Sequence, residues 1–493
     1  MWIATAAAFL ARRADAAIPG AYGKEAQRRE GRRCLAGHMR INPRHTTRPL
    51  DVLGAPGWGE VDARGLVQPG TGKWTLDWWV GASDRWHRAS QEAAVRQSEV
   101  GAGAVVETRM KVPDGDAVQR VWAVAAGGGP AVAVVEVGNE AATAFAVAMV
   151  VESPGSAITV NQAGVAVGGQ PVLVWDRPPA GAAVGHDAVE ALLEVEGGGA
   201  AGLDRKGRDV AALVWPLPHS ARLAVSASLG RGMPSPPSDL PDADAVRRGW
   251  QAHLDRGARI EVPDEGLARR IDRNRRRWLG NTGRMETADV AELCGLSVRL
   301  DHHGYHDDAA LVLDEIAARW TTEAPTERLR AFTVHHDLTG DQQAAARFAE
   351  AVAEAVEAAA RTGAEVLLEP VERLLVAADQ GRAAEDLRRL DLSPADPPSD
   401  GLRAELVADD GEDLLLAPGF RPAWQGGSLA VYGLPTRFGP VSYAVRWHGT
   451  RPALLWELDA RPGQKPVTLR APALDHTWSS DEPTGETLLA AHR

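Results

Sequence analysis

The sequence predicts a multidomain α+β protein with an N-terminal antiparallel β-sandwich, a central array of helical hairpins and a small C-terminal β-domain. Hydrophobic residues between 42 and 229 alternate with a period of two, which is typical of strands. Between 264 and 392 the period lengthens to that of amphipathic helices, and strand-like patterns return from 402 to 470. A chain of 493 residues is also too long for one core of usual size, so we expect about three domains.

Two proline-rich segments, at 233–241 and 393–400, mark the boundaries of these regions. Proline fixes φ and lacks a backbone N–H, so no ladder of hydrogen bonds continues through such a segment. We therefore expect a β-sandwich, a linker that contains a helix, a helical domain, a β-domain and a tail, at 39–232, 233–263, 264–392, 401–472 and 473–493.

Residues 1–38 show no hydrophobic period. Their short apolar run at 2–10 is followed by Arg12 and Arg13, whereas a signal peptide carries its positive charge before the apolar run. We interpret this segment as disordered or as a spurious extension, with Met39 as a plausible start. No stretch is long and apolar enough for a membrane span. We expect a cytoplasmic protein.

Strand-like runs follow one another through the first region with turn residues between them. In 73–80 (KWTLDWWV), Trp74, Leu76 and Trp78 alternate on one side. Many strands at intervals of roughly ten residues, with no helices between them, indicate antiparallel sheets packed as a sandwich. The other runs are at 104–112, 118–126, 131–137, 145–151, 156–175, 209–214 and 221–229.

The helical region begins at Asp264, a suitable N-cap residue. In 264–281, Leu267, Ile271, Trp278 and Leu279 recur at helical spacing between arginines. The short connections between successive helices indicate helical hairpins. Further helices are expected at 286–300, 306–320, 325–338, 341–361, 364–378 and 383–390, one linker helix at 242–256, and C-terminal strands at 402–407, 413–417, 427–432, 439–448, 452–458 and 466–470.

The order of regions resembles the six-hairpin glycosidase superfamily, in which a β-sandwich precedes an α/α toroid and a C-terminal β-domain. The likeness lies in 416–447 (LAPGFRPAWQGGSLAVYGLPTRFGPVSYAVRW) and in 300–310 (LDHHGYHDDAA), where a helix ends in Gly-aromatic-His. The resemblance implies a glycoside-hydrolase-like architecture. Twelve helices would need roughly 200 residues, more than 264–392 offers, so we expect an incomplete toroid.

Four acidic residues are candidates for glycosidase chemistry. Glu286 and Asp289, and likewise Glu369 and Glu372, are three residues apart and would share a helix face. A glycosidase places its two carboxylates across a cleft, so we assign neither pair as catalytic, and solvated surface is the simpler interpretation.

Four tryptophans, Trp74, Trp78, Trp79 and Trp86, lie close together. On a strand, Trp74 and Trp78 face one side and Trp79 the other, so at least one ring is expected in the core. Alternatively, flat rings beside acidic residues form a platform for a sugar, and we keep all four as candidate substrate-binding residues.

The densest group of metal-capable side chains runs from Asp301 to Asp308 and includes His302, His303 and His306. Imidazole and carboxylate suit zinc, but the spacing matches no metal motif and a glycine divides the group. The alternative is a helix end followed by two acids that open the next helix. A second group, His335, His336 and Asp337, is weaker. We keep the three histidines as metal candidates and expect no cofactor.

Composition limits the function classes. The net charge of −12 argues against a general nucleic-acid binder, and the arginine-rich run at 269–277 is interpreted as a solvated helix face. Cys34 and Cys294 lie in unrelated segments and predict neither a disulfide framework nor a thiolate metal site. Residues 70–73 (GTGK) lack the spacing of a phosphate loop.

The leading hypothesis is a non-catalytic, glycoside-hydrolase-like protein that binds glucan or oligosaccharide. One alternative is an active glycosidase or glycoside phosphorylase whose acid and base are not identified. Another is a scaffold that binds a protein partner or a second copy, because an open helical array leaves apolar faces that need cover. We expect neither a nucleic-acid nor a membrane partner.

Overall fold

The computed structural model describes residues 47–490, apart from 54, 56, 71, 102, 126–128, 195–204, 320, 389–400 and 464–465. The chain has a mixed α+β fold, as predicted, and divides into two compact units, Met1–Gln251 and Ala252–Arg493. The expected N-terminal extension at 1–38 and the expected start at Met39 lie outside the described residues. None of the described helices is both long and apolar enough to cross a membrane.

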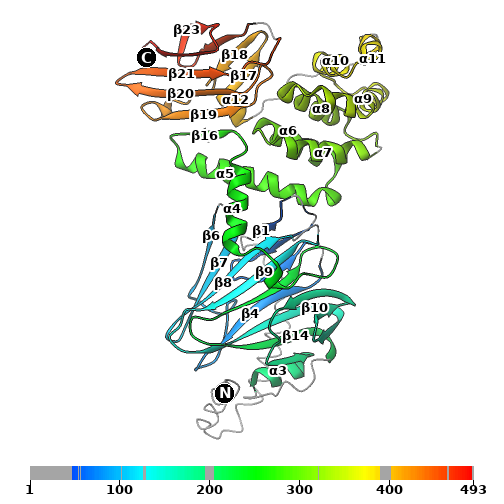
Figure 1. Cartoon of the computed structure of the whole chain (residues 1–493), viewed down its shortest axis with the longest axis vertical. Coiled ribbons are helices and arrows are strands. Elements are labelled where there is room, and N and C mark those ends of the chain that lie inside the picture. Colours follow the sequence, from blue (N-terminus) through cyan, green and yellow to red (C-terminus); the bar gives the residue numbers. More distant parts are fainter. Residues whose placement is uncertain are drawn as a thin grey trace. The chain divides into compact units, whose positions relative to one another are not determined.

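The first unit is built on a 15-stranded antiparallel sheet, drawn in blue to green in Figure 1. The main path of the sheet runs β1-β2-β3-β4-β10-β11-β12-β15-β9-β8-β7-β6. The strands are β1 (Arg48–Asp51), β2 (Trp58–Val61), β3 (Val67–Pro69), β4 (Thr75–Gly81), β5 (Trp86–Arg88), β6 (Val95–Val100), β7 (Val105–Val112), β8 (Gly115–Val124), β9 (Val132–Asn139), β10 (Phe145–Asn161), β11 (Gly164–Val167), β12 (Gln170–Trp175), β13 (Gly181–Val184), β14 (Arg205–Leu217) and β15 (Arg222–Ser228).

The expected sandwich of separate sheets is therefore corrected to one large curled sheet. The long strand β10 explains the difference, because it pairs with β4 on one side and with β14 on the other, and near its end with β11. Trp78 of β4, Val121 of β8 and Leu213 of β14 belong to the same buried cluster, so strands far apart along the sheet close around one core.

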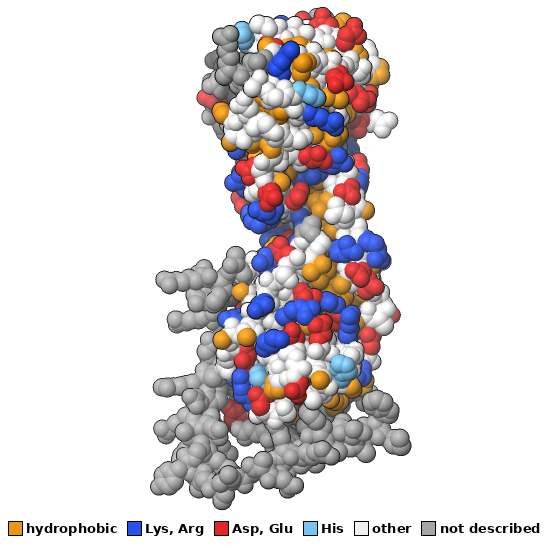
Figure 2. All heavy atoms as spheres, turned by 90° about the vertical axis from the view of Figure 1, so that its left-hand side faces the viewer, with side chains coloured by type: hydrophobic (Ala, Val, Ile, Leu, Met, Phe, Trp, Pro, Cys, Tyr) orange, Lys and Arg blue, Asp and Glu red, His pale blue; other side chains and the backbone are white. Residues whose placement is uncertain are grey.

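In the middle of β7 and β8, alternate residues face the apolar core and the residues between them form ion pairs on the other face of the sheet. Val106 of β7 and Val121 of β8 are opposite each other and buried in the core. Their neighbours Glu107 and Arg120 are also opposite each other, and the Arg120 Nε lies 2.9 Å from the Glu107 Oε2. Figure 2 shows basic and acidic side chains intermixed on the face that it draws.

One helix of the first unit was not expected from the sequence. Helix α3 (His186–Glu194) carries Val189, which is buried with Trp79 and Val210 in a second cluster outside the main core. The prediction that no helix lies between these strands is therefore wrong. The apolar face that β4, β10 and β14 present on this side is covered by the helix.

The helices between residues 243 and 387 are those that the hydrophobic period predicts, but their ends are shifted. Asp264 caps α5 as expected, and its carboxylate accepts a hydrogen bond from the Leu267 N–H. Helix α6 packs against α7 and α8, and α8 packs against α9 and α10. The helices are α4 (Ala243–Leu254), α5 (Glu265–Asn281), α6 (Val290–His302), α7 (His306–Ala318), α8 (Pro325–Thr339), α9 (Gln342–Thr362), α10 (Leu368–Ala377) and α11 (Gly381–Leu387), with a 3-10 turn η3 (Thr282–Thr287).

The C-terminal strands form two sheets of five and four strands, in the orders β16-β19-β20-β21-β24 and β17-β18-β22-β23. Leu267 and Ile271 of α5 are buried in the same cluster as Leu429 and Val445, so the first long helix and the C-terminal sheets share a core. The strands are β16 (Arg259–Glu261), β17 (Val407–Asp410), β18 (Asp413–Leu416), β19 (Leu429–Leu434), β20 (Val441–His448), β21 (Arg451–Leu458), β22 (Thr468–Ala471), β23 (Asp475–Ser480) and β24 (Thr484–Leu488).

Two expectations for this region are wrong. The segment expected as a strand at 402–407 is mostly helix α12 (Leu402–Leu406). The segment expected as a tail at 473–493 contributes β23 and β24, which pair with β22 and β21. In both cases long-range pairing and packing decide the structure of segments whose own hydrophobic pattern is weak.

Candidate functional site

The second unit contains a cavity of about 380 Å³ between α5, α6, α8 and α12. Helix α5 contributes Asn274 and Trp278, one helical turn apart, and α6 contributes Arg299 and His302 from a single face. The volume is in the range of small-molecule sites. The lining residues are Ile271, Asn274, Trp278, Gly295, Val298, Arg299, His302, His303, Arg330, Gly401, Leu402 and Arg403.

The polar lining of the cavity is basic. Arg299, Arg330 and Arg403 come from three helices, and no Asp or Glu is among the described residues that line it. Arg299 lies at the exposed rim, and its pKa is lowered by partial burial and by the neighbouring Arg277 and Arg330. Arg403 donates a hydrogen bond to the Pro435 carbonyl oxygen (3.0 Å) and lies 3.5 Å from Asp409. This concentration of positive charge in a chain of net charge −12 favours an anionic ligand.

His302 and His303 form the buried end of the cavity. Burial and the charge of Arg403 hold the pKa of His302 well below its usual value. Burial, with Arg275 and Arg403 nearby, lowers the pKa of His303 to about 3, so both rings are neutral at pH 7. The His303 ring lies against Trp278, with 4.8 Å between ring centroids. Among the described atoms, His303 Nδ1 is buried without a hydrogen-bond partner.

The expected metal group of His302, His303 and His306 is divided by the fold. His302 and His303 line the cavity, whereas His306 contacts Asp301 and His335. The tight turn between α6 and α7 causes the division. Gly304 has φ of 83°, a conformation that glycine adopts without strain, and it reverses the chain between the two helices. His306 therefore begins α7 and contacts Asp301, whereas His302 lines the cavity.

Asp301 joins three helices. It is fully buried near the end of α6, and its Oδ1 lies 2.8 Å from His306 Nδ1 on α7 and 2.9 Å from His335 Nδ1 on α8. One atom of each residue lies within 4.8 Å of the others. His306 was a metal candidate from the sequence, whereas the group with His335 was the weaker one. Asp301 and His335 are 34 positions apart, so the sequence does not show their contact.

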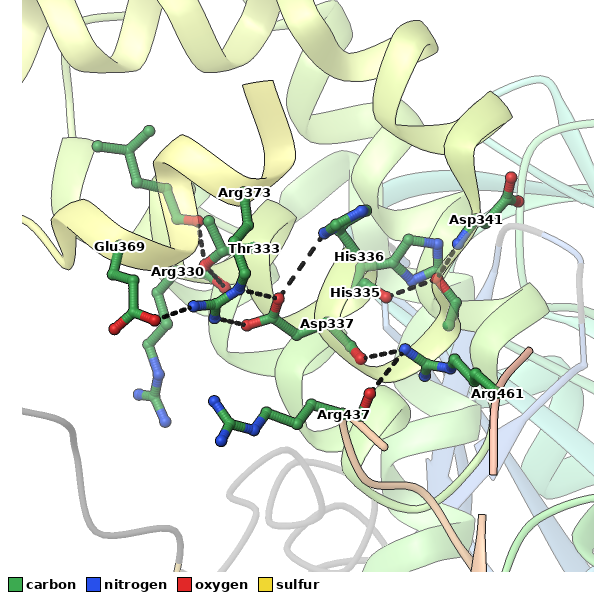
Figure 3. Close-up of polar contacts among 12 residues, drawn as sticks. Arg330, Thr333, His335, His336, Asp337, Asp341, Glu369, Arg373, Arg437 and Arg461 are labelled. Carbon is green, nitrogen blue, oxygen red and sulfur yellow. Dashed lines mark hydrogen bonds and ion pairs between the residues drawn. The ribbon is translucent and has the colours of Figure 1, made fainter. Parts of the chain in front are cut away.

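A neighbouring network fixes the end of α8. Figure 3 shows Arg373 of α10 and His336 approaching the Asp337 carboxylate, with Arg461 at the Asp337 carbonyl oxygen. Burial by itself would raise the pKa of Asp337, but the contacts with His336 and Arg373 lower it. The network holds the part of α8 that carries His335.

Three of the four candidate acids have structural partners, and the fourth, Glu286, is exposed. Glu286 is exposed in η3, and Asp289 is the N-cap of α6 in a capping box with Glu292. The expectation that this pair shares a helix face is therefore wrong. Glu369 pairs with Arg373, and Glu372 pairs with Arg388. None of these residues lines the cavity.

The tryptophan platform is also corrected. Trp74, Trp78 and Trp79 are 6%, 0% and 2% exposed, and Trp79 donates a hydrogen bond to Asp77 Oδ2 (2.8 Å). Trp86 is half-buried and donates to the Leu193 carbonyl oxygen. As expected, Trp78 and Trp79 occupy opposite faces of the strand, but both faces are covered. The three buried rings cannot stack on a ligand in this structure.

No protein-family model and no curated protein matches the chain. Among solved structures, it is similar to an inverting mannosidase of family GH92 from Bacteroides thetaiotaomicron, with 9% identity and a TM-score of 0.21 over 70% of this chain. The similarity spans 59% of the mannosidase, less than two thirds of its length. A TM-score of 0.21 does not establish a common fold, so the six-hairpin architecture stays a prediction.

Proposed function

We propose that the second unit is a non-catalytic binding module for an anionic carbohydrate, a saccharide that carries a phosphate or carboxylate group. The observation that carries the proposal is the cavity that Arg299, Arg330 and Arg403 line together with the half-buried ring of Trp278. Guanidinium groups match phosphate and carboxylate oxygens, and an indole ring offers a flat face to a sugar. The proposal includes the expectation that α5 to α11 are an incomplete α/α toroid.

Neutral histidines suit the sugar part of this ligand. A neutral imidazole offers one N–H donor and one acceptor nitrogen, which is the pairing that a hydroxyl group needs. The low pKa values of His302 and His303 keep both rings in this state at pH 7. Asn274 adds an amide that can donate and accept in the same way.

Glycosidase activity, the first alternative, has less support. A hydrolase of this kind needs one protonated and one ionised carboxyl group in a cleft. The cavity lined by Arg299, Arg330 and Arg403, called the arginine cavity below, has no carboxyl group among its described lining residues. A second cavity, on the first unit, is lined by Glu136 and Glu140, but Glu136 lies 3.2 Å from Arg222 and Glu140 lies 2.7 Å from Arg109. Both carboxylates are therefore already paired with arginine.

The scaffold alternative needs a large apolar surface on the helices. Among the described residues of the helical region, the exposed large hydrophobic side chains are Leu311 on α7 and Val376 on α10. Two separate side chains are ordinary for a protein surface. The cavity therefore supports ligand binding better than it supports a protein partner.

The test is a calorimetric titration of the full chain with inorganic phosphate, glucose 6-phosphate, glucuronate and a neutral glucan oligosaccharide. The proposal expects saturable binding of a charged sugar. Arg299→Gln should weaken that binding by at least about tenfold, because a hydrogen bond to a charged group contributes roughly 1.5–3 kcal/mol. Trp278→Ala should weaken the binding of glucose 6-phosphate more than the binding of inorganic phosphate.

Arg273→Gln is the matched control, since Arg273 is exposed on α5 and does not line the cavity. It should bind like the wild type. Binding of none of the four compounds, or equal binding of the charged sugar by wild type and Arg299→Gln, would refute the proposal.

A further inference from the structure

We infer that Asp301, His306 and His335 form a binding site for a divalent transition-metal ion, with Zn²⁺ as the test ion. The site is separate from the arginine cavity and does not depend on the proposed function. One carboxylate oxygen and two imidazole nitrogens are the donor set of many zinc sites with three protein ligands. The three donor atoms come from α6, α7 and α8 and lie within 4.8 Å of one another.

The distances between the donor atoms fit such an ion after a small expansion. Ligands at about 2.0–2.2 Å from a tetrahedral zinc ion are roughly 3.3 Å from one another. Asp301 Oδ1 lies 2.8 Å from His306 Nδ1 and 2.9 Å from His335 Nδ1. Each distance has to grow by about half an ångström, which small side-chain rotations provide. Both histidines already present the same ring nitrogen to the same oxygen.

The three side chains differ in burial, with a fully buried carboxylate at Asp301 and a partly exposed imidazole at His306. The Asp301 side chain is fully buried, and that of His335 is 5% exposed, whereas that of His306 is 30% exposed. A buried carboxylate is costly unless it is paired or coordinates a metal ion. His306 is the partly exposed ligand of the three, so the group reaches solvent through its side chain.

The surroundings hold two of the ligands in place. His335 lies against Phe348 on its far side, with 6.4 Å between ring centroids and a T-shaped arrangement. The backbone N–H of Gly304 donates to the Asp301 carbonyl oxygen (3.0 Å), which fixes the end of α6. Positioned ligands lower the entropic cost of binding an ion.

The alternative is that Asp301 only joins three helices through hydrogen bonds from the two imidazoles. The two possibilities differ in one respect: a metal site binds one ion per chain with both imidazoles as ligands, whereas a purely structural group binds no ion. The decisive experiment is therefore performed on the full wild-type chain after removal of metal by a chelator.

Zn²⁺ is titrated by calorimetry, and Co²⁺ is titrated with visible absorption. We expect one ion bound per chain and a tetrahedral Co²⁺ spectrum. His306→Gln should weaken binding by at least about tenfold. His336→Gln is the matched control, because His336 adjoins His335 on α8 but contacts Asp337, and it should bind as the wild type does.

His306 is the residue to replace because it is the most exposed member, so this variant is the one that retains the fold. Absence of stoichiometric Zn²⁺ binding by the wild type would overturn the inference, and so would equal affinity of the His306→Gln and wild-type chains. Asp301→Asn, if it folds, should lose binding as well.

Discussion

Arg328 of α8 is fully buried, and its Nη2 lies 2.8 Å from Glu354 Oε2 of α9. The Arg328 Nη1 also donates to the Thr321 carbonyl oxygen (2.6 Å). The pair joins the two helices inside the second unit, and Arg328 has no access to water that could replace its partner.

Glu354→Ala should therefore destabilise the protein by about 3–5 kcal/mol, because it leaves a buried guanidinium without its counter-charge. Urea denaturation followed by circular dichroism measures the change. Asp314→Ala is the control, since Asp314 and Arg347 also join two helices, α7 and α9, at 3.4 Å but on the exposed surface. That variant should change stability by less than about 1 kcal/mol. Equal effects of the two substitutions would show that burial of Arg328 is unimportant.

The buried His303 predicts that the protein loses stability in acid. Its pKa is about 3 in the folded chain, below that of an ordinary histidine, so the unfolded chain binds the proton more readily. Above the unfolded-state pKa of about 6.5, the free energy of unfolding keeps its full value with respect to this group. It decreases as the pH falls from there toward the folded-state pKa. Between pH 7 and pH 5 the loss from this group is about 2 kcal/mol.

Denaturation curves of wild type and His303→Gln at the two pH values measure this contribution. The variant should lose about 2 kcal/mol less than the wild type over the interval. His448→Gln, at an exposed position, should keep the wild-type dependence. An unchanged dependence in His303→Gln would mean that His303 is not the group responsible.

Trp79→Ala should act on stability and leave carbohydrate binding unaffected. The ring is 2% exposed, packs with Val150 and Val210, and has the Arg88 guanidinium 4.0 Å above its centre. Truncation of a buried tryptophan costs about 3–5 kcal/mol. Met233→Ala, at a side chain that is 54% exposed, should stay within about 0.5 kcal/mol of wild type. A Trp79→Ala chain with wild-type stability and weakened glycan retention would restore the sugar-platform hypothesis.

Local chemistry predicted the helices well. Asp264 caps α5, Pro325 opens α8, and Asp341 caps α9 through hydrogen bonds from the N–H groups of Gln343 and Ala344. Caps and hydrophobic period act over a few residues, so they can be recognised in a sequence. The same pattern predicted that Trp78 and Trp79 lie on opposite faces of a strand, but it could not show that α3 covers one of those faces.

The amino-acid sequence by itself determined where helices and strands alternate, and it placed Asp301, His302, His303 and His306 around one helix junction. Only the tertiary structure decided that His302 and His303 join Arg330 and Arg403 at a cavity, while His306 meets His335 at Asp301. The physical reason is the separation along the chain over which each kind of interaction acts. Backbone propensities and caps act between neighbouring residues, whereas a site forms where packed helices bring distant side chains together, and that packing depends on the whole core.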